Sequence, residues 1–226
     1  MNKMFSFPFL LLIIFATLQA NEVEEIDVNT VSKAVGHVIA RQFVYPGFSF
    51  NFDKVIEGMQ EAREGKASPM TDQEIEQALA TIQETVFLKT AEENLEKANS
   101  FLKKNQTEKG VVSLEEKLQY KVIQMGQGEE ICVDSVPKIH YRGTLVDGTE
   151  FANSRDGEPV EISLDQTIAG FSKGITGMKE GEIRILYIHP DLGYGMSSHL
   201  PPNSLLIFEI ELMKIQEQKT IASEEA

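Results

Sequence analysis

The sequence predicts an α+β protein in which an all-α N-terminal half and a long spacer helix precede an antiparallel β-sheet wrapped on one short helix. Up to about residue 104, apolar residues recur at the three- and four-residue spacing of amphipathic helices. From Gly110 onward, β-branched and aromatic residues become frequent and alternate with polar ones, as in strands. At 226 residues the chain is long enough for two domains, and we place their boundary at Gly110.

Two short amphipathic helices are predicted before residue 70. The first carries Val31, Val35, Val38 and Ile39 on one face and ends before Pro46-Gly47. The second runs from Phe52 through Ala62, with Gly65 as its stop. Because so small a helical layer makes a marginal core, we expect a second copy of the chain to cover these faces. Residues 21–70 would then be a dimerisation domain, and a self-sufficient three-helix unit is the alternative.

A third, much longer helix is predicted for residues 71–106. Thr71-Asp72-Gln73-Glu74 is a capping box, and nothing breaks the helical pattern from there to about Lys104. At 1.5 Å per residue this helix would span about 50 Å. We expect its first half to pack with the dimerisation domain. Its second half is richer in Glu, Lys and Asn and is expected to be a largely solvated spacer.

The segment 111–216 reads as a sheet with one helix. Leu118 to Ile123 is the first clear strand, and Asp147-Gly148 marks a hairpin between strands at 139–145 and 149–151. Pro137 predicts a sheet edge or a β-bulge at the start of the strand at 139–145. Further elements are expected as a strand at 160–164, a helix at 168–178, a strand at 183–189 and a last strand that contains Phe208, Ile210 and Leu212.

Two of these elements carry further detail. In the last strand Glu209 and Glu211 alternate with the apolar residues, so that one face is buried and the other is wetted. In the helix at 168–178, the glycines at 170, 174 and 177 indicate close packing on a sheet. Residues 217–226 follow as an acidic tail.

Composition excludes several classes of function. The formal net charge of −14 argues against a nucleic-acid partner, because binding to a phosphate backbone needs a basic surface. The only cysteine, Cys132, cannot form an internal disulfide, and we interpret it as a small buried hydrophobic side chain. The four histidines (37, 140, 189 and 199) have no carboxylate or second cysteine at ligand spacing. We therefore expect no metal site and no cofactor.

Residues 1–20 have the features of a secretory signal peptide. Lys3 supplies the positive start, residues 9–18 are nearly all apolar, and Leu18-Gln19-Ala20 is a candidate cleavage site. The apolar run is short for a membrane span, and an uncleaved anchor is the alternative.

The motifs of the C-terminal half resemble those of the FKBP-type peptidyl-prolyl cis-trans isomerases. The matching phrases are Ile139-His140-Tyr141, residues 145–151, residues 177–181, Leu192-Gly193-Tyr194-Gly195 and residues 200–208. In the N-terminal half, residues 57–62, Gly65, Thr71 and Glu74 resemble the dimerisation segment of the secreted bacterial Mip and FkpA-like members. The resemblance covers nearly all of the chain after residue 20. It implies location in the periplasm or at the outer-membrane surface of a Gram-negative-type bacterium.

By this resemblance, an apolar pocket would hold the substrate proline. The implied catalytic residues are Tyr141, Phe151, Ile168, Phe171, Tyr194 and Phe208. The implied additional substrate-binding residues are Val160, Thr167, His199 and Leu200. The backbone N–H of Ile168 and the hydroxyl of Tyr194 would donate hydrogen bonds to carbonyls of the bound peptide. Ordinary core packing is the alternative for each of these side chains, but buried phenols need partners and aromatics at a rim are typical of apolar sites.

The implied function is isomerisation of X-Pro bonds in folding envelope or secreted polypeptides. Rotation about such a bond is opposed by amide resonance, and no bond has to break. A dry aromatic cleft disfavours the charge-separated planar amide more than the twisted transition state, and such differential binding accelerates the step. The partners would be proline-containing extended polypeptides and a second copy of the chain.

The sequence also departs from the family pattern. Ala152 stands where the family commonly has Asp, Phe171 where it often has Trp, and Thr167 where it has Val. The loop between Tyr194 and Pro201 is short. These departures favour weaker activity and argue against binding of the macrolides that target the family. A dimeric binding chaperone with little isomerase activity is therefore the alternative function.

Overall fold

The computed structural model describes residues 27–45, 47–132, 135–197 and 199–217. The predicted signal peptide at residues 1–20, and all but the first residue of the predicted acidic tail, lie outside the described residues. The chain divides into two compact units, residues 1–44 and 45–226. In the described part, the helices fall short of the length and apolar character that crossing a bilayer requires.

The first unit contains helix α1 (Val28–Gln42), which confirms the first predicted helix. The carboxylate of Asp27 caps it by accepting hydrogen bonds from the N–H groups of Asn29 and Thr30. No residue of α1 is buried, and the exposed fractions of Val31, Val35 and Val38 are 47%, 50% and 47%. The predicted apolar face is therefore present and lies open in the single chain.

The second unit begins with small elements. Strands β1 (Val44–Tyr45) and β2 (Phe48–Ser49) form a two-stranded sheet, and helix α2 (Phe52–Arg63) follows. Gly65 ends this helix region with a φ of +76°, a left-handed conformation that suits glycine. These features confirm the second predicted helix and its stop.

Helix α3 (Asp72–Asn105) is the long helix that the capping box predicts. The Thr71 hydroxyl accepts from the N–H of Glu74, and the Glu74 carboxylate accepts from the N–H of Thr71. The expectation of a largely solvated second half is wrong, because that half carries the buried residues of the helix: Ala91, Ala98, Leu102 and Asn105.

The C-terminal half of α3 is buried because it packs on one face of the main sheet. Ala98 and Leu102 form an apolar cluster with Leu205, and Tyr187 and Ile207 pack against it. The side-chain amide of Asn105 donates to Gln119, and the amide of Gln119 donates to the carbonyl oxygen of Leu102. This half is an integral part of the second unit and not a solvated spacer.

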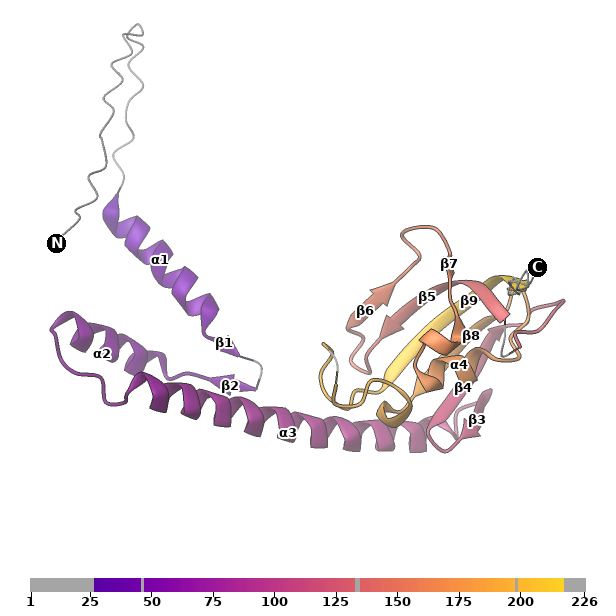
Figure 1. Cartoon of the computed structure of the whole chain (residues 1–226), viewed down its shortest axis with the longest axis horizontal. Coiled ribbons are helices and arrows are strands. Elements are labelled where there is room, and N and C mark those ends of the chain that lie inside the picture. Colours follow the sequence, from indigo (N-terminus) through magenta and orange to yellow (C-terminus); the bar gives the residue numbers. More distant parts are fainter. Residues whose placement is uncertain (1–26, 46, 133–134, 198, 218–226) are drawn as a thin grey trace, which may run out of the picture. The chain divides into compact units, whose positions relative to one another are not determined.

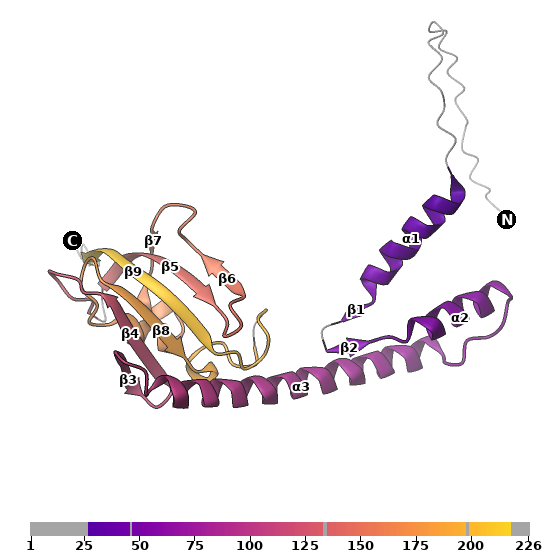
Figure 2. The ribbon, with the colours of Figure 1, turned by 180° about the vertical axis from the view of Figure 1, so that it is seen from behind.

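The main sheet is antiparallel and has seven strands. They are β3 (Val111–Glu115), β4 (Leu118–Gln124), β5 (Ser135–Thr144), β6 (Glu150–Asn153), β7 (Val160–Glu161), β8 (Ile183–Ile188) and β9 (Leu206–Glu217). The spatial order is β3-β4-β8-β9-β5-β6, and β7 also pairs with β5. Strand β9 therefore lies between β8 and β5, as Figure 2 shows for the yellow ribbon. The fold class is the predicted α+β.

The strand signals in the sequence are confirmed in detail. In β9, Phe208, Ile210 and Leu212 are buried, whereas Glu209 and Glu211 are partly exposed. In the hairpin between β5 and β6, Gly148 has a φ of +87° and donates its N–H to Leu145. The register between β5 and β9 shifts between Lys138 and Ile139, next to Pro137, so the predicted bulge is present.

Helix α4 (Ala169–Ile175) packs on the face of the sheet opposite α3 (Figure 1). A Cβ atom at Gly170 would lie 2.3 Å from Cγ2 of Ile188, and one at Gly174 would lie 2.6 Å from Cδ1 of Leu186. Glycine is thus required for the close contact of helix and sheet at both positions. The core between them is built from buried residues of both layers: Phe171, Ile175, Met178, Leu186, Ile188, Phe208, Ile210 and Leu212.

Several local expectations differ from the structure. The strand expected at 160–164 is limited to β7, and the 3-10 turn η1 (Leu164–Gln166) follows it. Helix α4 is shorter than the expected 168–178. Gly177 has a φ of +78° with open space around it, so its role is the backbone turn and not close packing.

Cys132 is exposed and not buried as expected. It lies in the connection between β4 and β5, where its neighbour Ile131 takes the buried position with only 1% exposure. The N–H of Ile131 donates to the carbonyl oxygen of Met178, and the N–H of Cys132 donates to the hydroxyl of Ser135. These bonds fix the backbone so that Cys132 faces solvent.

Candidate active site

Three aromatic rings from three other elements meet around Phe208 of β9. Phe171 of α4 lies 5.2 Å from it between ring centroids and Phe151 of β6 lies 5.4 Å from it, both edge to face. Tyr141 of β5 lies 6.4 Å from it in a tilted arrangement. Edge-to-face pairs at these distances are favourable beyond the area that they bury. The rings therefore stabilise one another in an apolar cluster.

Gly143 makes room for this cluster. It pairs with Phe208 on one side and with Ala152 on the other. A Cβ atom at Gly143 would lie 2.7 Å from Cζ of Phe151 and 3.0 Å from Cε1 of Phe208. Any side chain at this position would displace the two rings.

The rings line an open cavity of about 310 Å³, which we call the aromatic pocket. Its lining residues are Tyr141, Phe151, Ala152, Ile162, Gln166, Thr167, Ile168, Phe171, Tyr194, His199 and Phe208. The structure thus brings together all six expected catalytic residues and two of the four expected substrate-binding residues, Thr167 and His199.

The other two expected residues do not line the aromatic pocket. Val160 is 39% exposed on β7, and Ile162 takes the lining position instead. Both residues would share one face of a continuous strand, but β7 ends at Glu161 and the chain turns into η1. Leu200 packs against the main core and lines a neighbouring groove. Sequence reasoning also missed Gln166, which lines the pocket. Its only signal in the sequence is its position two residues before Ile168.

Tyr194 is held by a pair of glycines at the rim. The N–H groups of Gly193 and Gly195 both donate to the carbonyl oxygen of Pro190, at 3.0 and 3.1 Å. Gly195 has a φ of +55°, which suits glycine. The tight turn leaves the Tyr194 side chain 40% exposed at the mouth of the pocket.

His189 stabilises the turn that leads to Tyr194. Its side chain is 2% exposed, and Nδ1 accepts from the N–H of Asp191 at the start of the 3-10 turn η2 (Pro190–Leu192). Nε2 lies 3.2 Å from the side-chain oxygen of Asn99 on α3. Burial lowers the pKa of His189 from its ordinary value, although the carboxylate of Asp191 acts in the opposite direction. The neutral imidazole therefore fits this position.

Ile168 is the residue at the N-cap of α4 and has an extended backbone, with φ −63° and ψ 146°. The first N–H groups of a helix have no acceptor within the helix. Ile168 lines the pocket at the start of α4, beside Thr167, whose own hydroxyl donates to the carbonyl oxygen of Leu164.

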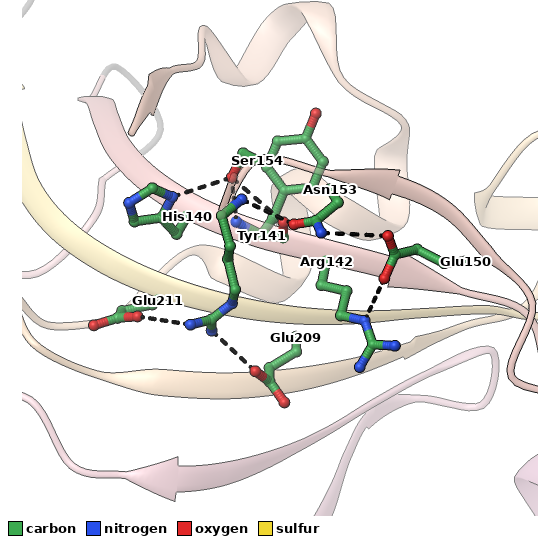
Figure 3. Close-up of polar contacts among 9 residues, drawn as sticks. His140, Tyr141, Arg142, Glu150, Asn153, Ser154, Glu209 and Glu211 are labelled. Atoms are coloured by element: carbon green, nitrogen blue, oxygen red, sulfur yellow. Dashed lines mark hydrogen bonds and ion pairs between the residues drawn. The ribbon is translucent and has the colours of Figure 1, made fainter. Parts of the chain in front are cut away.

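Ser154 fixes the backbone of Tyr141 (Figure 3). Its hydroxyl oxygen accepts from the N–H of Tyr141 at 2.8 Å, and its own N–H donates to the carbonyl oxygen of Tyr141 at 3.0 Å. Nδ1 of His140 lies 3.3 Å from the same hydroxyl. Ser154 therefore continues the pairing of β5 and β6 by one step with its side chain, directly beside the pocket.

Charged side chains lie apart from the Tyr141 ring in Figure 3. Arg155 pairs with Glu209 at 2.9 Å and with Glu211 at 3.3 Å, and Arg142 pairs with Glu150 at 2.6 Å. These contacts are on exposed or half-exposed side chains, where an ion pair contributes little to stability. These charged side chains of β5 and β9 lie on the face of the sheet opposite Tyr141 and Phe208.

A buried ion pair contacts the C-terminal end of α4. Arg184 of β8 contacts Glu182 at 2.7 Å and donates to the carbonyl oxygen of Gly174 at 2.7 Å. Its guanidinium also lies 4.3 Å from the ring centre of Tyr120. Since both charged side chains are less than 10% exposed, this network is fully enclosed and holds the C-terminal end of α4.

The chemistry of the pocket follows from its lining. It presents aromatic and aliphatic surface with a few polar groups at the edge, an arrangement that binds an apolar ring and orients an attached amide. Among the residues that the structure describes, no group of three or more His, Cys, Asp or Glu side chains is placed to hold a metal ion.

Comparison with known proteins agrees with this geometry. Residues 127–213 match the family described as FKBP-type peptidyl-prolyl cis-trans isomerase. Residues 28–122 match the domain amino terminal to FKBP-type peptidyl-prolyl isomerase. The Mip peptidyl-prolyl cis-trans isomerase of Chlamydia muridarum is 42% identical over 201 residues, which are 88% of this chain and 83% of that protein. The chain belongs to the FKBP-type peptidyl-prolyl isomerase family.

Two further relatives support the assignment of this FKBP-type chain. The outer membrane protein MIP of Legionella longbeachae is 30% identical over 84% of this chain and 86% of its own length. The crystal structure of FkpA from Escherichia coli has a TM-score of 0.67 at 32% identity and covers 84% of this chain and 94% of that one. The helical half and the sheet half are therefore both features of known family members.

Proposed function

We propose that this chain catalyses cis–trans isomerisation of X-Pro peptide bonds, with the aromatic pocket as its active site. The observation that carries the proposal is the cluster of Tyr141, Phe151 and Phe171 around Phe208, which lines a pocket of about 310 Å³. Membership in the FKBP-type isomerase family supports the same reaction.

The substrate proline would sit among the rings with its preceding amide at the mouth of the pocket. The planar amide owes its barrier of about 18–20 kcal/mol to a charge-separated resonance form. An apolar wall solvates that form poorly, while the twisted amide has less charge separation and is penalised less. The pocket thus lowers the barrier by differential binding, without a covalent intermediate.

Two donors would orient the bound peptide. The N–H of Ile168 at the start of α4 and the hydroxyl of Tyr194 at the rim are the groups that we assign to carbonyl oxygens of the substrate. Donors that hold the twisted geometry reduce the entropy lost on reaching the transition state. Thr167 and His199 complete the binding surface around them.

A binding chaperone with little turnover is the second candidate, because Ala152 lines the pocket where the family resemblance implies Asp. A protease-coupled assay on a short proline peptide distinguishes the two functions. We expect cleavage of the cis fraction well above the uncatalysed rate. Turnover no faster than the uncatalysed reaction, with suppression of aggregation intact, would leave only the chaperone.

We further propose that the N-terminal helices form a homodimer. Support comes from the open apolar faces of α1 and α2, in which no residue is buried within one chain. In α2, Ile56 and Met59 are 51% and 48% exposed. A second copy is the simplest cover for such faces. Sedimentation of a chain that lacks residues 21–90 should give a monomer, and a persistent dimer would refute the assignment.

An envelope location completes the proposal. The sequence features of residues 1–20 indicate export, and relatives include a protein named as an outer membrane protein. The substrates would then be proline-containing segments of unfolded exported polypeptides.

A further inference from the structure

A second cavity, of about 410 Å³, lies beside the aromatic pocket and is larger than it. We call it the helix–flap groove. Its lining residues are Phe48, Leu79, Ile82, Gln83, Val86, Phe87, Thr90, His199, Leu200, Pro201 and Pro202. One wall comes from α3, and the opposite wall comes from residues 199–203, which we call the flap. No site assigned above includes this groove.

The α3 wall is an apolar stripe. Leu79, Ile82 and Val86 follow the spacing of three and four residues that places side chains on one face of a helix. Gly47 lies close against this stripe, since a Cβ atom there would lie 2.6 Å from Cγ1 of Val86. Phe48, which follows Gly47, also lines the groove.

The C-terminal end of the flap is fixed by three hydrogen bonds. The amide of Asn94 on α3 donates to the carbonyl oxygen of Pro202 at 2.9 Å, and the amide of Asn203 donates to that of Ala91 at 3.2 Å. The N–H of Asn203 also donates to Gly195, next to Tyr194, at 2.8 Å. The groove is thus preformed, and a preformed site loses less conformational entropy on binding.

His199 lines both the helix–flap groove and the aromatic pocket. The two cavities therefore share an edge of the flap. An extended polypeptide advances by about 3.3 Å per residue, so a chain with its proline in the pocket continues past the flap within a few residues. Unfolded polypeptides also present the apolar side chains that a groove of this composition binds.

We propose that the helix–flap groove binds an apolar side chain of the same polypeptide whose proline occupies the aromatic pocket. The groove would make α3 part of the substrate site and would select segments in which an apolar residue lies near the proline. The inference rests on the proposed isomerase function. It adds to that function that kcat/KM depends on the substrate's sequence several residues away from the isomerised bond.

The test uses the full chain and two sets of synthetic peptides. Each peptide has the same central Ala-Leu-Pro-Phe core and carries either a Leu-Phe or a Ser-Ser pair, placed three, five or seven residues from the proline on either side. Isomerisation is followed by exchange NMR, and kcat/KM is compared within each pair. At one or more placements we expect the Leu-Phe peptide to be preferred about tenfold, which is about 1.4 kcal/mol. This is less than full burial of one large apolar side chain provides.

Phe87→Ser is the variant and Leu88→Ser is the matched control. Both side chains are exposed on α3, by 40% and 52%, but only Phe87 lines the groove. We expect Phe87→Ser to reduce the preference to about twofold or less, whereas Leu88→Ser retains it. Both variants should isomerise the bare tetrapeptide core like the unmodified chain, because neither side chain lines the aromatic pocket.

Three outcomes would overturn the inference. The first is an equal kcat/KM of the unmodified chain for the Leu-Phe and Ser-Ser peptides at every placement, and the second is a preference that Phe87→Ser and Leu88→Ser retain equally. A Phe87→Ser chain that sediments as a monomer while the unmodified chain is a dimer would assign the groove to a second copy. Loss of activity on the bare core in the unmodified chain would instead refute the isomerase function itself, so the two failures are distinguishable.

Discussion

Ser154→Ala tests whether the backbone beside the pocket sets the position of Tyr141. The change removes the acceptor of the Tyr141 N–H at 2.8 Å, at a position where the Ser154 side chain is only 8% exposed. A buried N–H left without a partner costs about 1–3 kcal/mol. The second unit spans residues 45–226, and for a domain of about 150–250 residues each kcal/mol lowers Tm by about 2–4 °C. We therefore expect a Tm loss of about 2–12 °C in thermal unfolding followed by circular dichroism.

Ser154→Ala should also lower the isomerase activity. If the Tyr141 ring loses its fixed position, kcat/KM on a proline peptide should drop about threefold to tenfold at a temperature where the variant is folded. Ser154→Thr keeps the hydroxyl and should restore most of the rate. Ser113→Ala is the control, because Ser113 lies exposed on β3. The reasoning is refuted if Ser154→Ala matches Ser113→Ala in both Tm and kcat/KM.

Three other changes address the pocket and its support. Ala152→Asp should raise kcat/KM if the missing carboxylate limits turnover at the pocket wall, and an unchanged rate would point instead to the flap or Phe171. Arg184→Met should lower the free energy of unfolding in urea by about 3–5 kcal/mol, because it leaves Glu182 charged and buried without its partner; a loss below about 1 kcal/mol would contradict the enclosed network. Burial lowers the pKa of His189 in the folded state, so the unfolded state binds more protons, and the free energy of unfolding should fall as the pH drops below 6.5, the ordinary pKa of histidine. His189→Asn should flatten this pH dependence. A variant with the same pH profile as the unmodified chain would argue against the role of His189.

Local signals in the sequence predict much of the catalytic half. The alternation around Phe208 gives the buried face of β9, and Asp147-Gly148 gives the turn between β5 and β6. The Thr71 capping box gives the start of α3. The aromatic residues of the pocket were found through the family resemblance of the motifs that contain them, since a pattern of burial alone does not distinguish a pocket wall from the core.

Features that depend on distant parts of the chain were not predictable in this way. The charged residues of the C-terminal half of α3 indicate a solvated helix, but Ala98 and Leu102 form a narrow stripe that is sufficient to pack on the sheet. Cys132 is exposed because the hydrogen bonds of Ile131 fix the direction of its neighbour. Val160 of β7 pairs with Ile139 and stays 39% exposed, whereas Ile162, just after the end of β7, lines the pocket.

Exchange NMR on a single proline peptide tests the central claim most directly, because it reports cis–trans interconversion without a coupled protease. With the chain at catalytic concentration, we predict interconversion faster than the uncatalysed rate, and Phe208→Ala should abolish most of the gain by removing the ring that the other three contact. Interconversion at the uncatalysed rate with the folded, unmodified chain would contradict the account.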